Sequence, residues 1–174
     1  MLEGSSRPSP VAGRPPVLAD LFPAARDAGG PVEVRVGTDF DVAALPEAEA
    51  RRVIALLAHR EPYPIGAVLA HEEGWLFLLP PGSAAGLSWP APFGYLDRGV
   101  LRVPPVPSAG PVFNDAGPLR WIRFGTPERR AFTAPLVLYA VAPLLVRETA
   151  RVGAVACGAR PARFSLSGRG VCHV

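Results

Sequence analysis

Residues 65–79 read IGAVLAHEEGWLFLL and form the clearest strand pair in the sequence. Two apolar runs rich in β-favouring residues, Ile65–Ala70 and Trp75–Leu79, flank four turn-like residues at 71–74. Two short apolar runs around a glycine-containing turn are typical of a β-hairpin. We therefore expect two antiparallel strands here, with the Pro80-Pro81-Gly82 stretch ending the second one.

Three further segments favour strands. Val32–Val36 alternates apolar and polar residues with period two, which is typical of a half-buried strand. Gly99–Val103 and Leu119–Phe124 are short β-favouring runs joined by a loop rich in proline and glycine. These segments extend the hairpin into a sheet.

Two segments favour helices. Leu45–Ala58 has Pro46 at its start, acidic residues in its first turn and apolar residues at helical spacing. Ala131–Val146 is apolar throughout, and its 16 residues fall short of the roughly 20 that a membrane span needs. We expect it to be a buried helix that starts near Pro135 and bends near Pro143. The fold class is then α+β: one domain with a mixed, mostly antiparallel sheet and two main helices packed on it.

The length of 174 residues fits a single domain. We expect a flexible Pro/Ala/Gly-rich arm over residues 1–30, a folded domain over 31–152 and a basic, glycine-rich tail over 153–174. A small apolar segment at Val17–Phe22 is expected to dock on the domain or to cap a short helix. The sequence shows no signal-peptide pattern and no membrane span, so we expect a cytoplasmic protein.

All 18 cationic residues are arginine. This composition fits the codon usage of a GC-rich genome, and it also fits phosphate recognition by guanidinium groups. Four arginines in or beside the expected strands are the candidates for nucleic-acid binding: Arg98, Arg102, Arg120 and Arg123.

Candidate catalytic residues occur at three places. Asp39 and Asp41 would lie on the same face of an extended segment, where two carboxylates can hold a divalent metal. His71 lies at the hairpin turn, and Asp97 begins the run YLDRGVLRVPP over residues 95–105. Each has a simpler interpretation: turn chemistry for the Asp pair, an exposed turn histidine, and a surface ion pair between Asp97 and Arg98.

Several segments between about Val32 and Val146 together resemble a known family. They are Val36–Val42, Leu45-Pro46, Gly74–Phe77 followed by Pro81-Gly82, Asp97–Pro105 and Gly117–Ile122. In order and spacing the chain resembles short actinobacterial proteins related to the N-terminal domain of bifunctional DNA primase/polymerases, of the archaeo-eukaryotic primase superfamily. Members of this superfamily act in DNA replication.

The resemblance also implies a degenerate active site. The two acids of the first family motif fall on Ala44 and Pro46, the family's histidine falls on Trp75, and only the third acid survives, as Asp97. We therefore expect a catalytically inactive primase/polymerase-like domain that binds nucleic acid, a nucleotide or a protein and needs no cofactor. The alternative is an active nucleotidyltransferase that uses Asp39, Asp41, His71 and Asp97 with Mg²⁺ or Mn²⁺. A further possibility is a partner of a larger machine, bound through the proline-rich arm or through Ala131–Val146.

Overall fold

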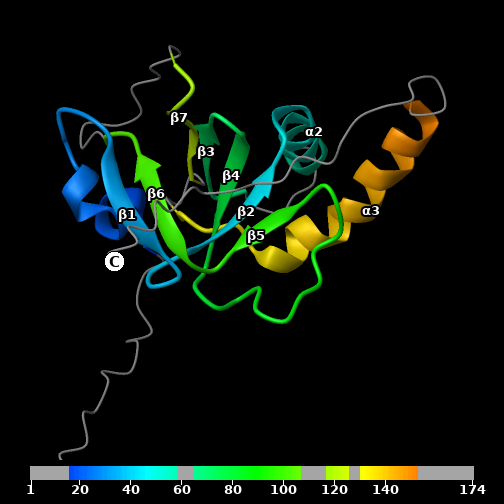
Figure 1. The fold of residues 1–174 in the computed structure, drawn as a ribbon, viewed down its shortest axis with the longest axis horizontal. Helices are drawn as coiled ribbons and strands as arrows, with labels where there is room; N and C mark the ends of the chain where they lie inside the picture. The colour runs from blue at the N-terminus through cyan, green and yellow to red at the C-terminus, as the bar shows by residue number, and fades with distance from the viewer. Residues whose placement is uncertain (1–15, 59–64, 107–116, 126–129, 153–174) are drawn as a thin grey trace, which may run out of the picture.

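The computed structural model describes residues 16–58, 65–106, 117–125 and 130–152. Its centre is a five-stranded antiparallel sheet in the order β5-β2-β4-β3-β7, beside a two-stranded sheet of β1 and β6 (Figure 1). The strands of the larger sheet are β5 (Gly94–Leu96), β2 (Asp41–Leu45), β4 (Gly74–Leu79), β3 (Ala67–His71) and β7 (Arg120–Phe124). The smaller sheet pairs β1 (Val32–Val36) with β6 (Gly99–Val103).

The predicted hairpin is confirmed as β3 and β4. His71 pairs with Gly74, which leaves Glu72 and Glu73 as the turn. β4 is buried along its whole length, and β2, its other neighbour, is buried as well. These strands are continuous apolar runs because both faces of the larger sheet are covered.

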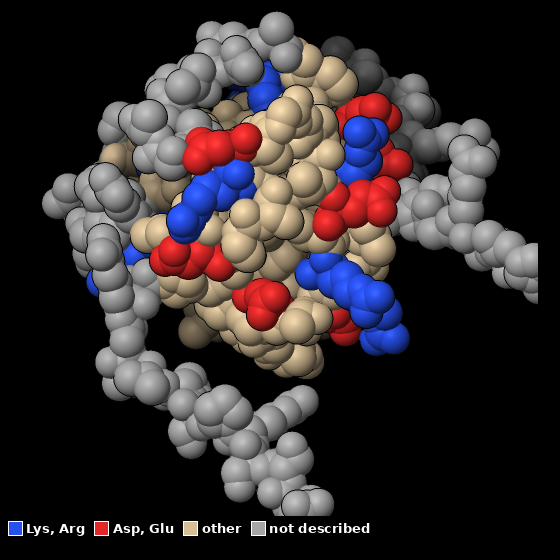
Figure 2. All heavy atoms as spheres, turned by 90° about the vertical axis from the view of Figure 1, so that its left-hand side faces the viewer, with Lys and Arg blue, Asp and Glu red and all other residues tan. Residues whose placement is uncertain are grey.

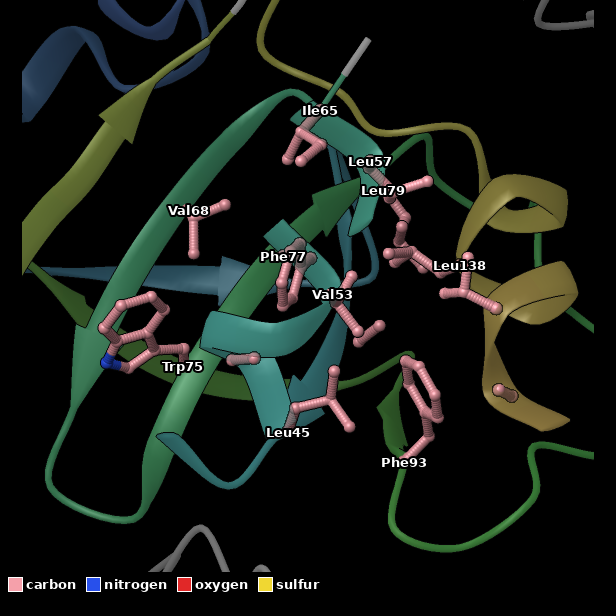
Figure 3. Close-up of a cluster of buried hydrophobic side chains, with 14 of the residues drawn as sticks. Leu45, Val53, Leu57, Ile65, Val68, Trp75, Phe77, Leu79, Phe93 and Leu138 are labelled. Atoms are coloured by element: carbon pink, nitrogen blue, oxygen red, sulfur yellow. The ribbon is translucent and has the colours of Figure 1, made fainter. Parts of the chain in front are cut away.

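Two helices cover one face of the larger sheet, as predicted. α2 (Glu47–Ala58) and α3 (Pro135–Val152) pack on β2, β3 and β4 through a first hydrophobic core, which Figure 3 shows around Phe77 and Leu138. α2 begins after Pro46, whereas Leu45 is the last residue of β2, so the predicted start of this helix at Leu45 is wrong by two residues. The described residues contain no helix that is both long and apolar enough to cross a membrane.

The smaller sheet and the N-terminal segment cover the other face. Here α1 (Leu18–Leu21) and the short 3-10 helix η1 (Pro23–Ala25) contribute to a second hydrophobic core. The ring of Phe22 lies 5.1 Å from that of Phe40 and 5.9 Å from that of Trp121, between centroids. The apolar segment therefore docks on the domain, and the folded unit includes part of the predicted arm over residues 1–30. The boundary at residue 30 is wrong because Phe22 and Ala25 are fully buried. Residues 1–15 and the tail 153–174 lie outside the described residues.

The chain passes between the two sheets at one corner of the molecule. β1 pairs with β6 and β2 pairs with β5, so the chain changes sheet once between β1 and β2 and again between β5 and β6. At the first crossing the Gly37 N–H donates to the Phe40 carbonyl at 2.7 Å, and at the second Asp97 and Arg98 join the strands. The fold class is the predicted α+β one, arranged in three layers: a small sheet, a large sheet and two helices.

Candidate functional site

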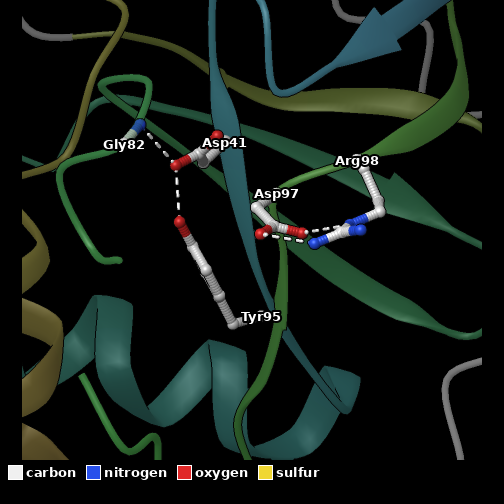
Figure 4. A network of polar contacts seen from close by, with 5 residues as sticks. All are labelled: Asp41, Gly82, Tyr95, Asp97 and Arg98. Carbon is white, nitrogen blue, oxygen red and sulfur yellow. Dashed lines mark hydrogen bonds and ion pairs between the residues drawn. The ribbon is translucent and has the colours of Figure 1, made fainter. Parts of the chain in front are cut away.

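Asp41 is a buried carboxylate at the start of β2. It is 1% exposed, and its Oδ2 accepts hydrogen bonds from the Gly82 N–H at 2.8 Å and from the Tyr95 hydroxyl at 2.6 Å (Figure 4). A buried charge needs such donors because it has lost its water. The carboxylate thus joins three segments: β2, the turn after β4, and β5.

Tyr95 is held in its protonated form by this arrangement. Burial raises the pKa of Tyr95 above its ordinary value, and the hydrogen bond to Asp41 raises it further. The negative charges of Asp41 and Asp97 act in the same direction. Tyr95 is therefore a hydrogen-bond donor to Asp41 at neutral pH.

Asp97 follows β5 at the end of the larger sheet where Asp41 lies, but its side chain points away from Asp41. Its Oδ1 accepts a hydrogen bond from Arg98 Nε at 3.0 Å, and this bond lowers the pKa of Asp97. In Figure 4 the carboxylates of Asp41 and Asp97 point to opposite sides of β2. Asp41 thus lies at the start of β2 and Asp97 directly after the neighbouring strand β5, but their side chains do not point toward one another.

Asp39 occupies a third position. It is exposed in the turn between β1 and β2, so the predicted same-face pair with Asp41 is wrong: the segment is a turn there and does not alternate as a strand would. Asp39 lines an open cavity of about 260 Å³ whose other walls come from α1, η1 and β1, with Phe22 and Phe40 among the lining residues.

His71 lies at the far end of the larger sheet. Asp41 pairs with Leu79 in β4, whereas His71 pairs with Gly74, five residues away along the same strand. At about 3.3 Å per residue, His71 is roughly 16 Å from Asp41 along the sheet. Among the described residues, no group of three or more histidine, cysteine or acidic side chains is placed to hold a metal ion.

The site positions that the family resemblance implies also lie at opposite ends of the larger sheet. Leu45 pairs with Trp75, so Ala44, Pro46 and Trp75 gather at the end of the sheet near His71. Asp97 comes after Leu96, which pairs with Val42 near the opposite end. Trp75 is buried and has the guanidinium of Arg51 at 4.8 Å from its ring.

The four candidate arginines have different settings: Arg98 lies between β5 and β6, Arg102 lies on β6, and Arg120 and Arg123 lie on β7. Arg98 is bound to Asp97, and Arg102 lies opposite Glu33 in the β1–β6 register. On β7, Arg120 donates to the Gly117 carbonyl at 2.5 Å. The buried Nε of Arg123 makes no hydrogen bond with any residue that the structure describes.

The face of the molecule that carries β1 and β6 has both acidic and basic side chains. Figure 2 shows acidic and basic side chains interspersed over the face that carries β1 and β6. The described residues contain as many acidic side chains as arginines, so the net charge of +3 comes from segments outside them.

The sequence reasoning missed an uncharged face. Residues 80–96 and 131–146 contain no charged side chain, and the structure packs these two segments together. Trp89 of the first segment meets Tyr139 of α3 edge to face, with ring centroids 6.1 Å apart, and also contacts Phe93 and Tyr95. The signal was present in the sequence as two long runs without charge.

In comparisons with protein-family models, curated proteins and solved structures, nothing matches this chain, and the resemblance to primase/polymerases stays a prediction.

Proposed function

We propose that this chain is a catalytically inactive primase/polymerase-like domain that works as a protein-interaction module. The observation that carries the proposal is the dispersal of Asp39, Asp41, His71 and Asp97 over separate sites. Asp41 has a structural role, since its Oδ2 holds Gly82 and Tyr95. A cytoplasmic location is part of the proposal.

The chemistry of nucleotidyl transfer explains why this dispersal matters. The two metal ions of such a site lie about 4 Å apart and need carboxylates that converge on them. Asp97 is paired with Arg98 on one side of β2, Asp41 is buried on the other side, and Asp39 projects from a turn. To bring these three carboxylates together, the corner between the two sheets would have to be rebuilt.

Two observations favour a protein partner over a nucleic acid. Binding to phosphates depends on cationic side chains that are free to meet them. Arg98 and Arg102 instead lie beside acidic residues, and the described residues have no surplus of positive charge. The uncharged face of residues 80–96 and 131–146 has the composition of the centre of a protein interface, which is poor in charge and rich in aromatic residues.

A nucleotide-incorporation assay tests the catalytic part of the proposal. The purified chain would be incubated with primed and unprimed templates, nucleotides and Mg²⁺ or Mn²⁺, beside the variant Asp97→Ala. The matched control is Asp20→Ala, because Asp20 is also an exposed carboxylate paired with an arginine, Arg26. We expect no incorporation above background for any of the three proteins. Incorporation by the wild type and by Asp20→Ala that is lost in Asp97→Ala would overturn the proposal.

A salt titration tests the nucleic-acid alternative. Fluorescent single-stranded DNA would be titrated at low and at moderate ionic strength, because phosphate contacts weaken as salt rises. We expect no binding that depends on Arg98 or Arg102. Low-salt binding that falls in both Arg98→Ala and Arg102→Ala would favour a nucleic-acid-binding module instead.

A further inference from the structure

A cavity of about 260 Å³ lies between the N-terminal segment and the turn that joins β1 to β2. Its inner part is apolar: Phe22 and Phe40 meet edge to face, with ring centroids 5.1 Å apart, and each is 1% exposed. Pro23 and Ala24 line the side formed by η1. Because their side chains are short, they leave space beside the aromatic pair.

Two opposite charges line the same cavity without meeting each other. Arg35 comes from β1 and Asp39 from the turn, and they are the charged members among the described lining residues. Neither makes an ion pair or a side-chain hydrogen bond with any residue that the structure describes. In the β1–β6 register Arg35 lies opposite the apolar Val100, whereas Arg102 lies opposite an acid, Glu33. Both charges at the cavity are therefore available to a ligand.

We infer that this cavity binds a small zwitterion with an apolar side chain, that is, a free apolar amino acid such as leucine. The guanidinium of Arg35 donates to the carboxylate of the ligand, and the carboxylate of Asp39 accepts from its ammonium group. The apolar side chain of the ligand lies against Phe22 and Phe40. The inference goes beyond the proposed function, because the site includes neither the uncharged face nor Asp97.

The pair of charges favours this class of ligand over others. A simple anion such as phosphate would meet the like charge of Asp39, and a simple cation would meet that of Arg35. A ligand with both signs on neighbouring atoms pairs with both residues at once. Figure 2, which views the molecule from the side of α1 and β1, shows an uncharged area bordered by acidic and basic side chains. An apolar centre with charged groups at its border matches an amino acid that has an apolar side chain.

The size of the cavity sets the size of the ligand and the expected affinity. Pockets for drug-sized molecules have volumes of about 300–1,000 Å³, so about 260 Å³ suits a smaller ligand. Such a ligand makes few contacts, and its ion pairs with Arg35 and Asp39 are exposed to water, where they contribute little. We therefore expect a dissociation constant on the order of 1 mM.

NMR titration of the full chain with L-leucine, from about 0.1 to about 50 mM, tests the site. Amide proton–nitrogen correlation spectra should show saturable shifts at residues 38–40. Three matched ligands each lack one feature of leucine: leucinamide lacks the carboxylate, isocaproate the ammonium group and glycine the apolar side chain. At about pH 6.5 the amine of leucinamide stays protonated. We expect binding about three- to tenfold weaker for the first two, and at least about tenfold weaker for glycine.

Two variants assign each charge of the ligand to its partner. Arg35→Gln should bind leucine as weakly as the wild type binds leucinamide, without any loss of affinity for leucinamide. Asp39→Asn should behave in the same way toward isocaproate. The matched controls are Arg102→Gln and Glu73→Gln, which each remove one exposed charge outside the cavity and should bind leucine like the wild type. The spectra also show whether each variant is folded.

The outcomes separate this inference from the proposed function. No saturable shift with leucine, or shifts confined to residues outside the cavity, overturns the site. Equal affinities for leucine, leucinamide and isocaproate overturn the recognition of a zwitterion, because the cavity would then be a general apolar cleft. A loss of leucine binding in the control variants as large as in Arg35→Gln and Asp39→Asn also overturns it. None of these results bears on nucleotide incorporation, whose dependence on Asp97 tests the proposed function.

Discussion

At the scale of single residues, the carboxylate of Asp41 connects parts of the chain that are far apart in sequence. It accepts from Gly82 and Tyr95, which are 41 and 54 residues away. The sequence singled out Asp41 as an acid of possible catalytic use, but nothing in its neighbours indicated these donors. Burial of an acid depends on which strands meet around it, and local patterns do not contain that information.

Removal of the Tyr95 hydroxyl should destabilise the fold. Tyr95→Phe leaves the buried Asp41 carboxylate with one donor fewer, which we expect to lower the free energy of unfolding by about 1–3 kcal/mol. Urea denaturation followed by circular dichroism measures the change. Tyr139→Phe is the matched control, since the Tyr139 side chain is partly exposed on α3, and it should stay within about 0.5 kcal/mol of the wild type. Equal effects of the two variants would show that the bond to Asp41 does not stabilise the protein.

The raised pKa of Tyr95 predicts a pH dependence of stability. Folded Tyr95 keeps its proton at a pH where the unfolded chain, with an ordinary tyrosine pKa of about 10, loses it. The stabilisation of the folded state by protonated Tyr95 is fully present below about pH 10. As the pH rises above that value, the free energy of unfolding falls by up to about 1.4 kcal/mol per pH unit. Unfolding free energies of the wild type and of Tyr95→Phe should therefore converge between about pH 10 and pH 12. A difference that stays constant over this range would contradict the prediction.

At the scale of elements, the sequence predicted most strands but not their distribution between sheets. Val32–Val36 and Gly99–Val103 were predicted with the bounds that the structure has. The hairpin was predicted with a four-residue turn at 71–74, whereas His71 pairs with Gly74 and only Glu72 and Glu73 form the turn. Period-two alternation indicates which side of a strand is buried, but not which sheet the strand joins. β5 was missed as a strand of its own because its three residues, Gly94–Leu96, are too short to show a pattern.

The corner between the sheets depends on Gly37. Gly37 has a φ of +95°, and a Cβ there would collide with the carbonyl oxygen of Asp97, which lies between β5 and β6. Gly37→Ala should thus cost at least about 2 kcal/mol in unfolding free energy, from strain and from displacement of the backbone. Gly29→Ala is the control, because a Cβ at Gly29 meets nothing within 4 Å. Chemical denaturation compares the two variants, and a Gly37→Ala protein as stable as Gly29→Ala would contradict this account of the corner.

At the scale of the whole molecule, the candidate site could be only partly predicted from the sequence. The acids were recognised one by one, but their separation follows from the register of β2, β4 and β5, which sequence spacing does not give. The uncharged face was visible only as two runs without charge, and their contact through Trp89 and Tyr139 appears in three dimensions. A sequence therefore indicates which residues are unusual more readily than which of them meet.

The two cores should unfold together, because they lie on opposite faces of the same three central strands. Phe22→Ala in the second core and Leu138→Ala in the first core each remove a fully buried side chain, at an expected cost of about 3–5 and about 2–5 kcal/mol. A change in either core disturbs β2, β3 and β4. Each variant should therefore lower the midpoint temperature of a single unfolding transition that both cores share. Thermal unfolding can be followed by far-ultraviolet circular dichroism and by tryptophan fluorescence, since Trp121 lies in the second core and Trp89 packs against the first. Coincident midpoints are expected for both probes in both variants. If Phe22→Ala instead shifted only the fluorescence signal, the N-terminal segment and the small sheet would be a separate unit that unfolds before the helices leave the larger sheet.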